Sequence, residues 1–189
     1  MSDQNLDIKE NKFKSFFLTN QKKIFLSILI VIIIFFGFFA YNYYKNVQNI
    51  KVSEKFNSVL IKISKNKKIQ IQDQLIEIIL EKNKFYSPMA LNLIIEKNIK
   101  IKDEEIINLF NAVLSISDMD ESDKDLFKIK KALFLSKENK NEEEILKLLK
   151  PVINSDSAWR VKALTFLEKY YLTNDERKKA KEFSDLLKK

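Results

Sequence analysis

The segment IFLSILIVIIIFFGFFAYNYY, residues 24–44, contains no charged residue and constrains the fold more than any other part of the chain. A helix needs about 20 predominantly apolar residues to cross the ~30 Å hydrocarbon core of a bilayer. A core helix of a soluble protein of that length would normally keep a polar face, but Ser27 is the only polar residue between Ile24 and Tyr41. We therefore predict a transmembrane helix over residues 24–44.

The ends of this segment carry residues that favour the boundary between lipid and water. Lysines flank the segment, and tyrosines cluster at its C-terminal end, where aromatic rings favour the headgroup layer. The predicted membrane-interface residues are Lys22, Lys23, Tyr41, Tyr43, Tyr44 and Lys45. Gly37 is the only glycine of the chain and has no small residue four positions away, so it does not form a helix-dimer motif.

A cleaved signal peptide is the alternative interpretation of the same segment. Its apolar region would run roughly 7–15 residues and end at a small-x-small site. Here the apolar run is longer, and the bulky Phe38 occupies the second small position before Ala40. We expect the segment to remain in the protein as an anchor.

The basic charge of the chain lies beside the apolar segment. The formal net charge is +8, and residues 71–189 are balanced between basic and acidic side chains. The excess therefore comes from residues 1–23 and, above all, from residues 45–70, where it is placed to face lipid headgroups rather than nucleic acid. Lysines within 15 residues of the span are more numerous on its N-terminal side, which favours a cytoplasmic N-terminus.

The composition excludes most enzyme classes. The chain has no Cys and no His, which removes disulfides, zinc sites of the Cys/His kind, thiol nucleophiles and His-based proton transfer. The acids at 103–105, 118–125 and 142–144 lack the glycine and terminal glutamate of a calcium loop. We predict a protein without catalytic, cofactor-binding or metal-binding residues, and we interpret these acids as helix caps and solvated faces.

Beyond the span, apolar residues recur at helical spacing between short polar breaks. Residues 45–68 are expected to form a basic juxtamembrane helix or linker, and residues 69–189 a helical domain. Helices are expected to start at Ser87-Pro88, Asp103, Asp123, Asn141, Ser157 and Asn174. The expected inward side chains include Leu126, Ile129, Ala132 and Leu133 in the segment that starts at Asp123, and Val161 and Tyr171 in the segment that starts at Ser157.

An Ala-Leu pair recurs in the domain, which indicates repeated helix pairs. It occurs at residues 90–91, 132–133 and 163–164, each time followed by a polar cap and a group of acids. The offsets, 42 and 31 residues, bracket the ~34-residue tetratricopeptide period. We predict an all-α fold with a single N-terminal transmembrane helix followed by a tetratricopeptide-like α-solenoid of helix pairs; the alternative is an irregular helical bundle.

An N-terminal membrane helix followed by degenerate repeats of this kind resembles the YfgM-like family, the ancillary subunits of the SecYEG translocon. The resemblance is carried by SDSAWRVKALTFLEKYYLTNDERKKAKEFSDLL, with Trp159-Arg160, Ala163 and Ala180, and by Tyr86-Ser87-Pro88 with Ala90. The family's turn glycines are missing, and Lys102, Lys140 and Asn174 stand near their places. Asn174 is expected to tolerate a positive φ there.

The resemblance implies a protein of the bacterial inner membrane with a cytoplasmic N-terminus, residues 1–23, and a periplasmic repeat domain. It implies contact with SecYEG and with a periplasmic chaperone such as PpiD. A membrane-tethered scaffold for envelope assembly or division is the alternative function. The residues offered as partner-binding are Trp159, Tyr170 and Tyr171. Trp159 is more simply read as packing on the preceding helix pair, and one of the adjacent tyrosines is expected to be buried and the other exposed.

Overall fold

A computed structural model describes residues 3–64, 71–138 and 142–188, and every regular element within these ranges is helical. The described elements are α1 (Asp3–Ser64), α2 (Ile71–Leu80), α3 (Tyr86–Glu96), α4 (Asp103–Leu114), α5 (Glu121–Leu135), the 3₁₀ turn η1 (Ser136–Glu138), α6 (Glu142–Ile153), α7 (Arg160–Thr173) and α8 (Arg177–Leu187). The polar break at 65–68 and the predicted caps at Lys140 and Asn141 lie outside the described residues.

The chain divides into two compact units between Lys51 and Val52. The first unit is the N-terminal part of α1, and it carries the one described helix that is long and apolar enough to cross a membrane. At 1.5 Å per residue, the stretch from Ile24 to Tyr44 is about 31 Å long, close to the thickness of the hydrocarbon core. Its large side chains are exposed along its whole length, as they would be in contact with lipid.

The second unit begins inside α1, because the last turns of that helix contribute to its core. Val52, Phe56 and Val59 are buried at the helical spacing of four and three residues. Phe56 packs on the ring of Tyr86 at 5.7 Å, and Lys55 Nζ lies 2.6 Å from the Glu77 carboxylate. The juxtamembrane helix expected over residues 45–68 is thus present as far as Ser64, and its C-terminal half is a packed part of the repeat unit.

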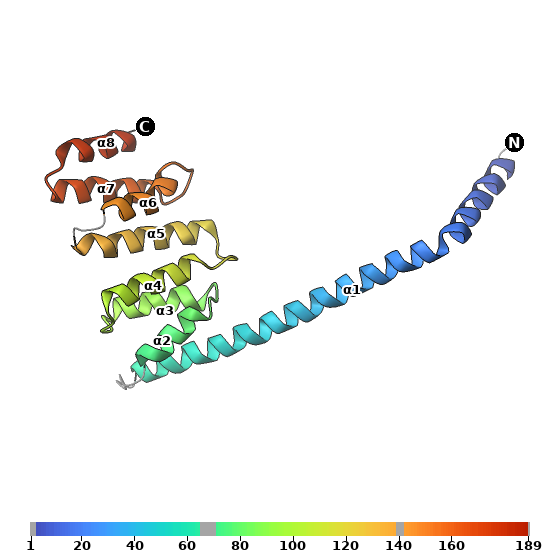
Figure 1. Cartoon of the computed structure of the whole chain (residues 1–189), viewed down its shortest axis with the longest axis horizontal. Helices are drawn as coiled ribbons and strands as arrows, with labels where there is room; N and C mark the ends of the chain where they lie inside the picture. Colours follow the sequence, from blue (N-terminus) through green and yellow to red (C-terminus); the bar gives the residue numbers. More distant parts are fainter. Residues whose placement is uncertain (1–2, 65–70, 139–141, 189) are drawn as a thin grey trace. The chain divides into compact units, whose positions relative to one another are not determined.

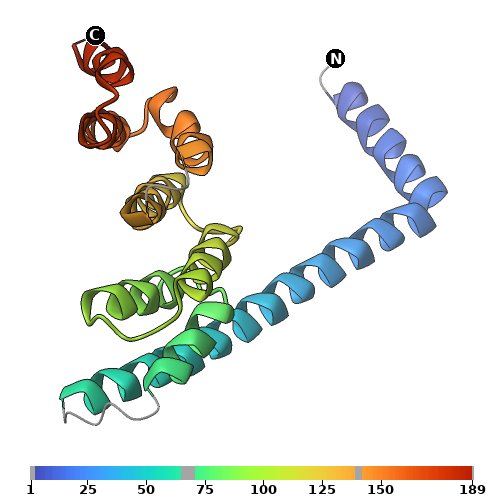
Figure 2. The same ribbon diagram turned by 60° about the vertical axis from the view of Figure 1, so that its left-hand side comes forward.

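Within this second unit, α2 to α8 follow one another in a stack (Figure 1). Helix α2 packs against α3 and α4, and α4 to α7 each pack against the next helix in the chain. The same succession is visible after rotation (Figure 2). The buried side chains form two clusters, one from Val52 to Phe127 and one from Ala132 to Ala180, so that α5 contributes to both.

The alanines of the Ala-Leu pairs all belong to the core. Ala90, Ala132 and Ala163 are all fully buried. Two of the expected inward residues are instead exposed, Leu133 at 56% and Val161 at 60%. In α5 the buried residues are Asp125, Phe127, Lys131, Ala132 and Leu135, and Leu133 lies outside the stripe that they form.

Helix ends without glycine use other residues in the left-handed region. Lys82, Asn98 and Asp175 have positive φ angles of 52°, 48° and 58°. After α7, the Asp175 amide donates to the Leu172 carbonyl and the Glu176 amide to the Tyr171 carbonyl, which is the Schellman arrangement. Asn174, expected in the positive-φ position, has φ −90°, and the last helix begins at Arg177 rather than at Asn174.

The expected start of α3 is also displaced, by two residues. Ser87 lies inside the helix and is buried, with its hydroxyl donating to the Ile78 carbonyl of α2. The cap is Asn83, whose Oδ1 accepts hydrogen bonds from the Phe85 and Tyr86 amides at 3.0 Å. The serine therefore ties α3 to α2, because its side chain finds a better acceptor across the helix pair than at its own helix end.

Candidate interaction surface

The predicted membrane-interface residues flank the apolar stretch of α1 on both sides. Lys22 and Lys23 are exposed one turn before it, and Tyr41, Tyr43 and Tyr44 are exposed in its last turn. Lys45 is half-buried and has an interaction partner. This spacing matches an apolar band between two polar boundaries; the membrane role of the six residues remains a prediction.

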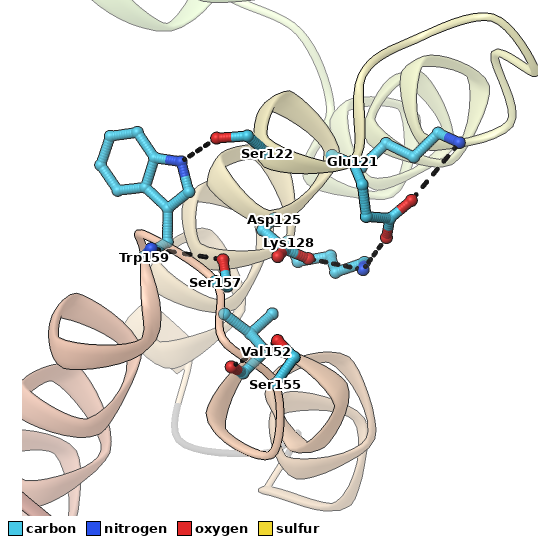
Figure 3. A network of polar contacts seen from close by, with 9 residues as sticks. Glu121, Ser122, Asp125, Lys128, Val152, Ser155, Ser157 and Trp159 are labelled. Atoms are coloured by element: carbon cyan, nitrogen blue, oxygen red, sulfur yellow. Dashed lines mark hydrogen bonds and ion pairs between the residues drawn. The ribbon is translucent and has the colours of Figure 1, made fainter.

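Trp159 stands at the N-terminal end of α7 and connects it to the preceding helix pair. Its indole Nε1 donates to the Ser122 hydroxyl of α5 at 3.2 Å, and its backbone amide donates to the Ser157 hydroxyl (Figure 3). The ring is half-buried against the second cluster. These contacts agree with packing on the preceding pair.

Tyr170 and Tyr171 are both buried, at 8% and 1% exposure, so the expectation of one exposed ring is wrong. The Tyr171 hydroxyl donates to Glu142 at 2.8 Å, and its ring stacks on Phe183 with the centroids 5.5 Å apart. Tyr170 packs edge-on against Tyr171. The Tyr171 side chain thus joins α7 to α6 and α8, whereas the ring contacts of Tyr170 are with Phe166 and Tyr171 of α7 itself.

Three of the exposed large apolar side chains of the repeat unit, Phe85, Met89 and Leu133, lie at α3 and α5. On α3, Phe85 and Met89 are 60% and 48% exposed, and they share a helix face with Asn92 and Glu96 because the spacings are four, three and four residues. On α5, Lys130 and Leu133 share a face by the same spacing rule, and Lys137 follows in the 3₁₀ turn η1.

A direct hydrogen bond joins these two faces. Lys130 Nζ donates to Asn92 Oδ1 at 2.7 Å, which brings α5 beside α3 although 38 residues separate them in the chain. We call Phe85, Met89, Asn92, Glu96, Lys130, Leu133 and Lys137 the α3–α5 surface. It combines three large exposed apolar side chains with fixed polar groups, which is the make-up of a protein-binding patch.

Lysine ammonium groups on and beside this surface lie over aromatic rings. Lys84 Nζ is 5.0 Å from the Phe85 ring centroid, Lys130 Nζ is 5.0 Å from that of Phe127, and Lys137 Nζ is 5.1 Å from that of Phe134. Burial lowers the pKa of Lys130, and the nearby Glu96 carboxylate partly opposes that shift. The surface is therefore basic and partly apolar.

The acidic side chains of the described ranges are dispersed over several helix ends and faces. These ranges hold no group of three acidic, His or Cys side chains that could bind a metal ion. The Asp125 carboxylate is paired with Lys128 at 2.7 Å (Figure 3), and the acids at the start of α4 occupy its first turn as expected for a helix N-terminus.

Sequence reasoning missed the α3–α5 surface because it treated apolar residues at helical spacing as core. Leu133 follows a buried alanine in the repeat register, and that register predicted it to be buried. The sequence does hold a sign of this exposure, because Phe85, Met89 and Leu133 lie outside the densest apolar stripe of their helices. When Ala90 and Ala132 face inward, these three side chains face outward.

A comparison with protein-family models matches residues 14–182 of the chain to the family described as Tetratricopeptide repeat-like domain. Neither the curated proteins nor the solved structures include a match to this chain. The matched range covers more than half of the 189 residues and includes all of α2 to α7. With its paired helices, buried repeat alanines and stacked order, the chain belongs to the tetratricopeptide repeat-like domain family.

Proposed function

We propose that this chain is a membrane-anchored, non-enzymatic protein whose repeat unit binds a partner protein through the α3–α5 surface. The observation that carries the proposal is that the exposed Phe85, Met89 and Leu133 lie at two helices whose faces a hydrogen bond joins. Stacked helical repeats present extended surfaces for binding other proteins. The apolar part of α1 supplies the anchor.

The resemblance to YfgM-like proteins suggests a more specific partner. It supports an ancillary subunit of the SecYEG translocon that links it to a periplasmic chaperone such as PpiD, with the repeat unit in the periplasm. The match to tetratricopeptide repeat-like domains agrees with this at the level of fold. A membrane-tethered scaffold for envelope assembly or division uses the same parts and is the second candidate.

Photo-crosslinking in cells tests the proposal. A photoreactive amino acid is placed at Met89 or Leu133, and in control chains at Leu172 or Lys181, which are exposed on α7 and α8. We expect protein adducts from the two α3–α5 positions and few from the controls. Equal yields from all four positions, or adducts from none, would contradict a dedicated surface.

The identity of the adducts separates the two functions. Translocon or chaperone components bound at Met89 and Leu133 would support the secretion role. Adducts confined to cell-wall or division proteins would support the scaffold role. Because the anchor raises the local concentration of membrane partners, moderate affinity in solution is expected in either case.

A further inference from the structure

Resting on the proposed function, we propose that the partner presents an acidic amphipathic segment to the α3–α5 surface. Its apolar side chains would cover Met89 and Leu133, and its carboxylates would approach the ammonium groups of Lys84, Lys130 and Lys137. The occupant is inferred from the charge and the apolar character that this surface combines.

The lysines of this surface differ from four lysines of the repeat unit that are paired with acids. Lys55, Lys128, Lys131 and Lys179 each lie within 3.0 Å of a carboxylate oxygen. By contrast, no ion pair joins Lys84, Lys130 or Lys137 to a carboxylate of the described residues, and each has its ammonium over an aromatic ring. Their positive charge is therefore held in place without being neutralised by a contacting acid.

Lys130 has the most specific environment of the three. Its ammonium is held by Asn92 at 2.7 Å and by the face of Phe127, and burial disfavours its charged form. A carboxylate arriving from a partner would restore the lost charge stabilisation, because hydrogen bonds between ionised groups are stronger than neutral ones. Glu96 lies close enough to attract Lys130 without forming a direct pair, so a bound acid would share the site with it.

The apolar contribution comes from both helices. Phe85 and Met89 are one turn apart on α3, and Leu133 lies one turn beyond Lys130 on α5. From residue 85 to residue 96 the α3 stripe extends about 16 Å, which corresponds to roughly 11 residues of a helical partner segment. Such a segment can place leucine-like side chains on one face and acids along its edges.

An anionic lipid surface is the other occupant that a basic, apolar patch could attract. The lysine that anchors the patch, Lys130, is half-buried and shares its site with Asn92 and the acidic Glu96. A lipid headgroup layer favours long, freely exposed lysines without acids between them. The fixed geometry of Lys130 therefore favours a peptide over a membrane.

The test uses the full chain in nanodiscs of phosphatidylcholine and three fluorescent 12-residue probe peptides. The first peptide carries leucines on one helical face and glutamates beside them. The second has glutamine in place of glutamate, and the third has serine in place of leucine. Binding is measured by fluorescence anisotropy at low and high salt.

We expect the acidic amphipathic peptide to bind at least ten times more tightly than either altered peptide, with affinity falling as salt rises. Lys130→Gln with Lys137→Gln should remove most of the preference for glutamate over glutamine. Met89→Ser with Leu133→Ser should remove the preference for leucine over serine. The matched control, Leu172→Ser with Lys181→Gln on α7 and α8, should leave both preferences within twofold.

Equal affinity for the glutamate and glutamine peptides would overturn the inference, as would tighter binding to nanodiscs that contain phosphatidylglycerol than to any peptide. Failure of the inference is distinguishable from failure of the proposed function. If Met89 and Leu133 crosslink in cells to neutral or basic segments of a protein, the interaction surface stands and the acidic partner does not. If they crosslink to no protein, the interaction surface itself is wrong.

Discussion

Lys131 Nζ lies 2.6 Å from the Glu144 carboxylate, and only 5% of the lysine side chain is exposed. The same ammonium donates to Asn111 Oδ1 at 2.8 Å, so that one lysine of α5 holds α4 and α6 together. Its neighbour Lys130 reaches α3. Two consecutive lysines of α5 thus contact both helices of the preceding pair and the helix that follows, at the point where the two apolar clusters meet.

This geometry predicts unequal costs for the two partners. Glu144→Ala removes the carboxylate and leaves the buried Lys131 ammonium with its hydrogen bond to Asn111. This substitution should lower the free energy of unfolding by roughly 1–2 kcal/mol. Lys131→Met removes the desolvated charge and keeps the apolar stem, so its cost should be small. Urea unfolding of the full chain in detergent measures both, with the fluorescence of Trp159, the only tryptophan, as the signal. A larger loss for Lys131→Met than for Glu144→Ala would contradict this prediction.

The order of helices and the pairing of the repeats follow from the sequence because they depend on periodicity and on small residues. Ala90, Ala132 and Ala163 recur along the chain and are all fully buried. The polar partners of Lys131 could not be predicted from the sequence. A lysine in the middle of a helix reads as a solvated residue, and only the three-dimensional approach of Asn111 and Glu144 makes the buried position of Lys131 possible.

The sequence predicts aromatic residues of α7 as partner contacts, whereas the surface proposed here lies on α3 and α5. The aromatic residues offered as partner contacts, Tyr170 and Tyr171, are covered because α6 and α8 meet over them. Helical spacing gives the face of a residue relative to its own helix, but whether a neighbouring helix covers that face depends on tertiary packing. For the same reason Leu133 was predicted to be buried.

The left-handed residue after α2 offers a stabilising substitution. Lys82 has φ 52°, a conformation that costs an L-residue other than glycine roughly 1–2 kcal/mol. Lys82→Gly should therefore raise the free energy of unfolding by about 1 kcal/mol. The matched control is Lys97→Gly, because Lys97 has φ −87° and glycine there only adds freedom to the unfolded chain. If both substitutions destabilise the protein equally, Lys82 does not adopt a left-handed conformation and this prediction is wrong.

The network around Glu142 predicts a specific dependence on pH. Hydrogen bonds from Lys179 and then from Tyr171 lower the pKa of Glu142 below its usual 4.5. A carboxyl whose pKa is lowered on folding stabilises the protein above its unfolded pKa, and this contribution is lost as the pH falls through the folded value. The free energy of unfolding should therefore decline below pH 4.5 more steeply in the wild type than in Glu142→Gln.

At alkaline pH the same network acts with the opposite sign. Burial, and then the Glu142 carboxylate, raise the pKa of Tyr171 above its usual 10.0. Its contribution is present below pH 10 and is lost as the pH rises towards the folded value, because the unfolded tyrosine ionises first. Tyr171→Phe should remove this part of the alkaline decline, as measured by urea titration from pH 9 upwards. An unchanged alkaline slope would show that the Tyr171 hydroxyl is in contact with water.

The repeat alanines should not tolerate larger side chains. Ala132 and Ala163 are fully buried where neighbouring helices approach, and overpacking a filled core costs about 1–3 kcal/mol. Ala132→Leu and Ala163→Leu should each lower the melting temperature by several degrees. Leu133→Ser, at an exposed neighbouring position, should change stability by no more than about 0.5 kcal/mol. Unchanged melting of both alanine variants would mean that the Ala-Leu register is coincidental.

The anchor proposed for α1 depends on the absence of charge between Ile24 and Tyr44. The full chain should remain in the membrane pellet after a carbonate wash with its N-terminus intact. Ile33→Arg places a charge at the centre of the span at a cost of about 2.5–3.5 kcal/mol of insertion free energy, and should release part of the chain into the soluble fraction. Ile50→Arg, outside the apolar stretch, is the matched control and should leave the chain in the pellet.

The orientation of that anchor is tested with a reporter that is active only in the periplasm, fused after Lys189. We expect activity, because lysines are more numerous on the N-terminal side of the span and hold that side in the cytoplasm. Replacing Lys22 and Lys23 by glutamine should reduce the activity, whereas replacing Lys178 and Lys181, far along the chain, should not. A soluble product that begins near Tyr41 would show that the segment is cleaved as a signal peptide, and a C-terminus protected from protease in spheroplasts would show that the orientation is reversed.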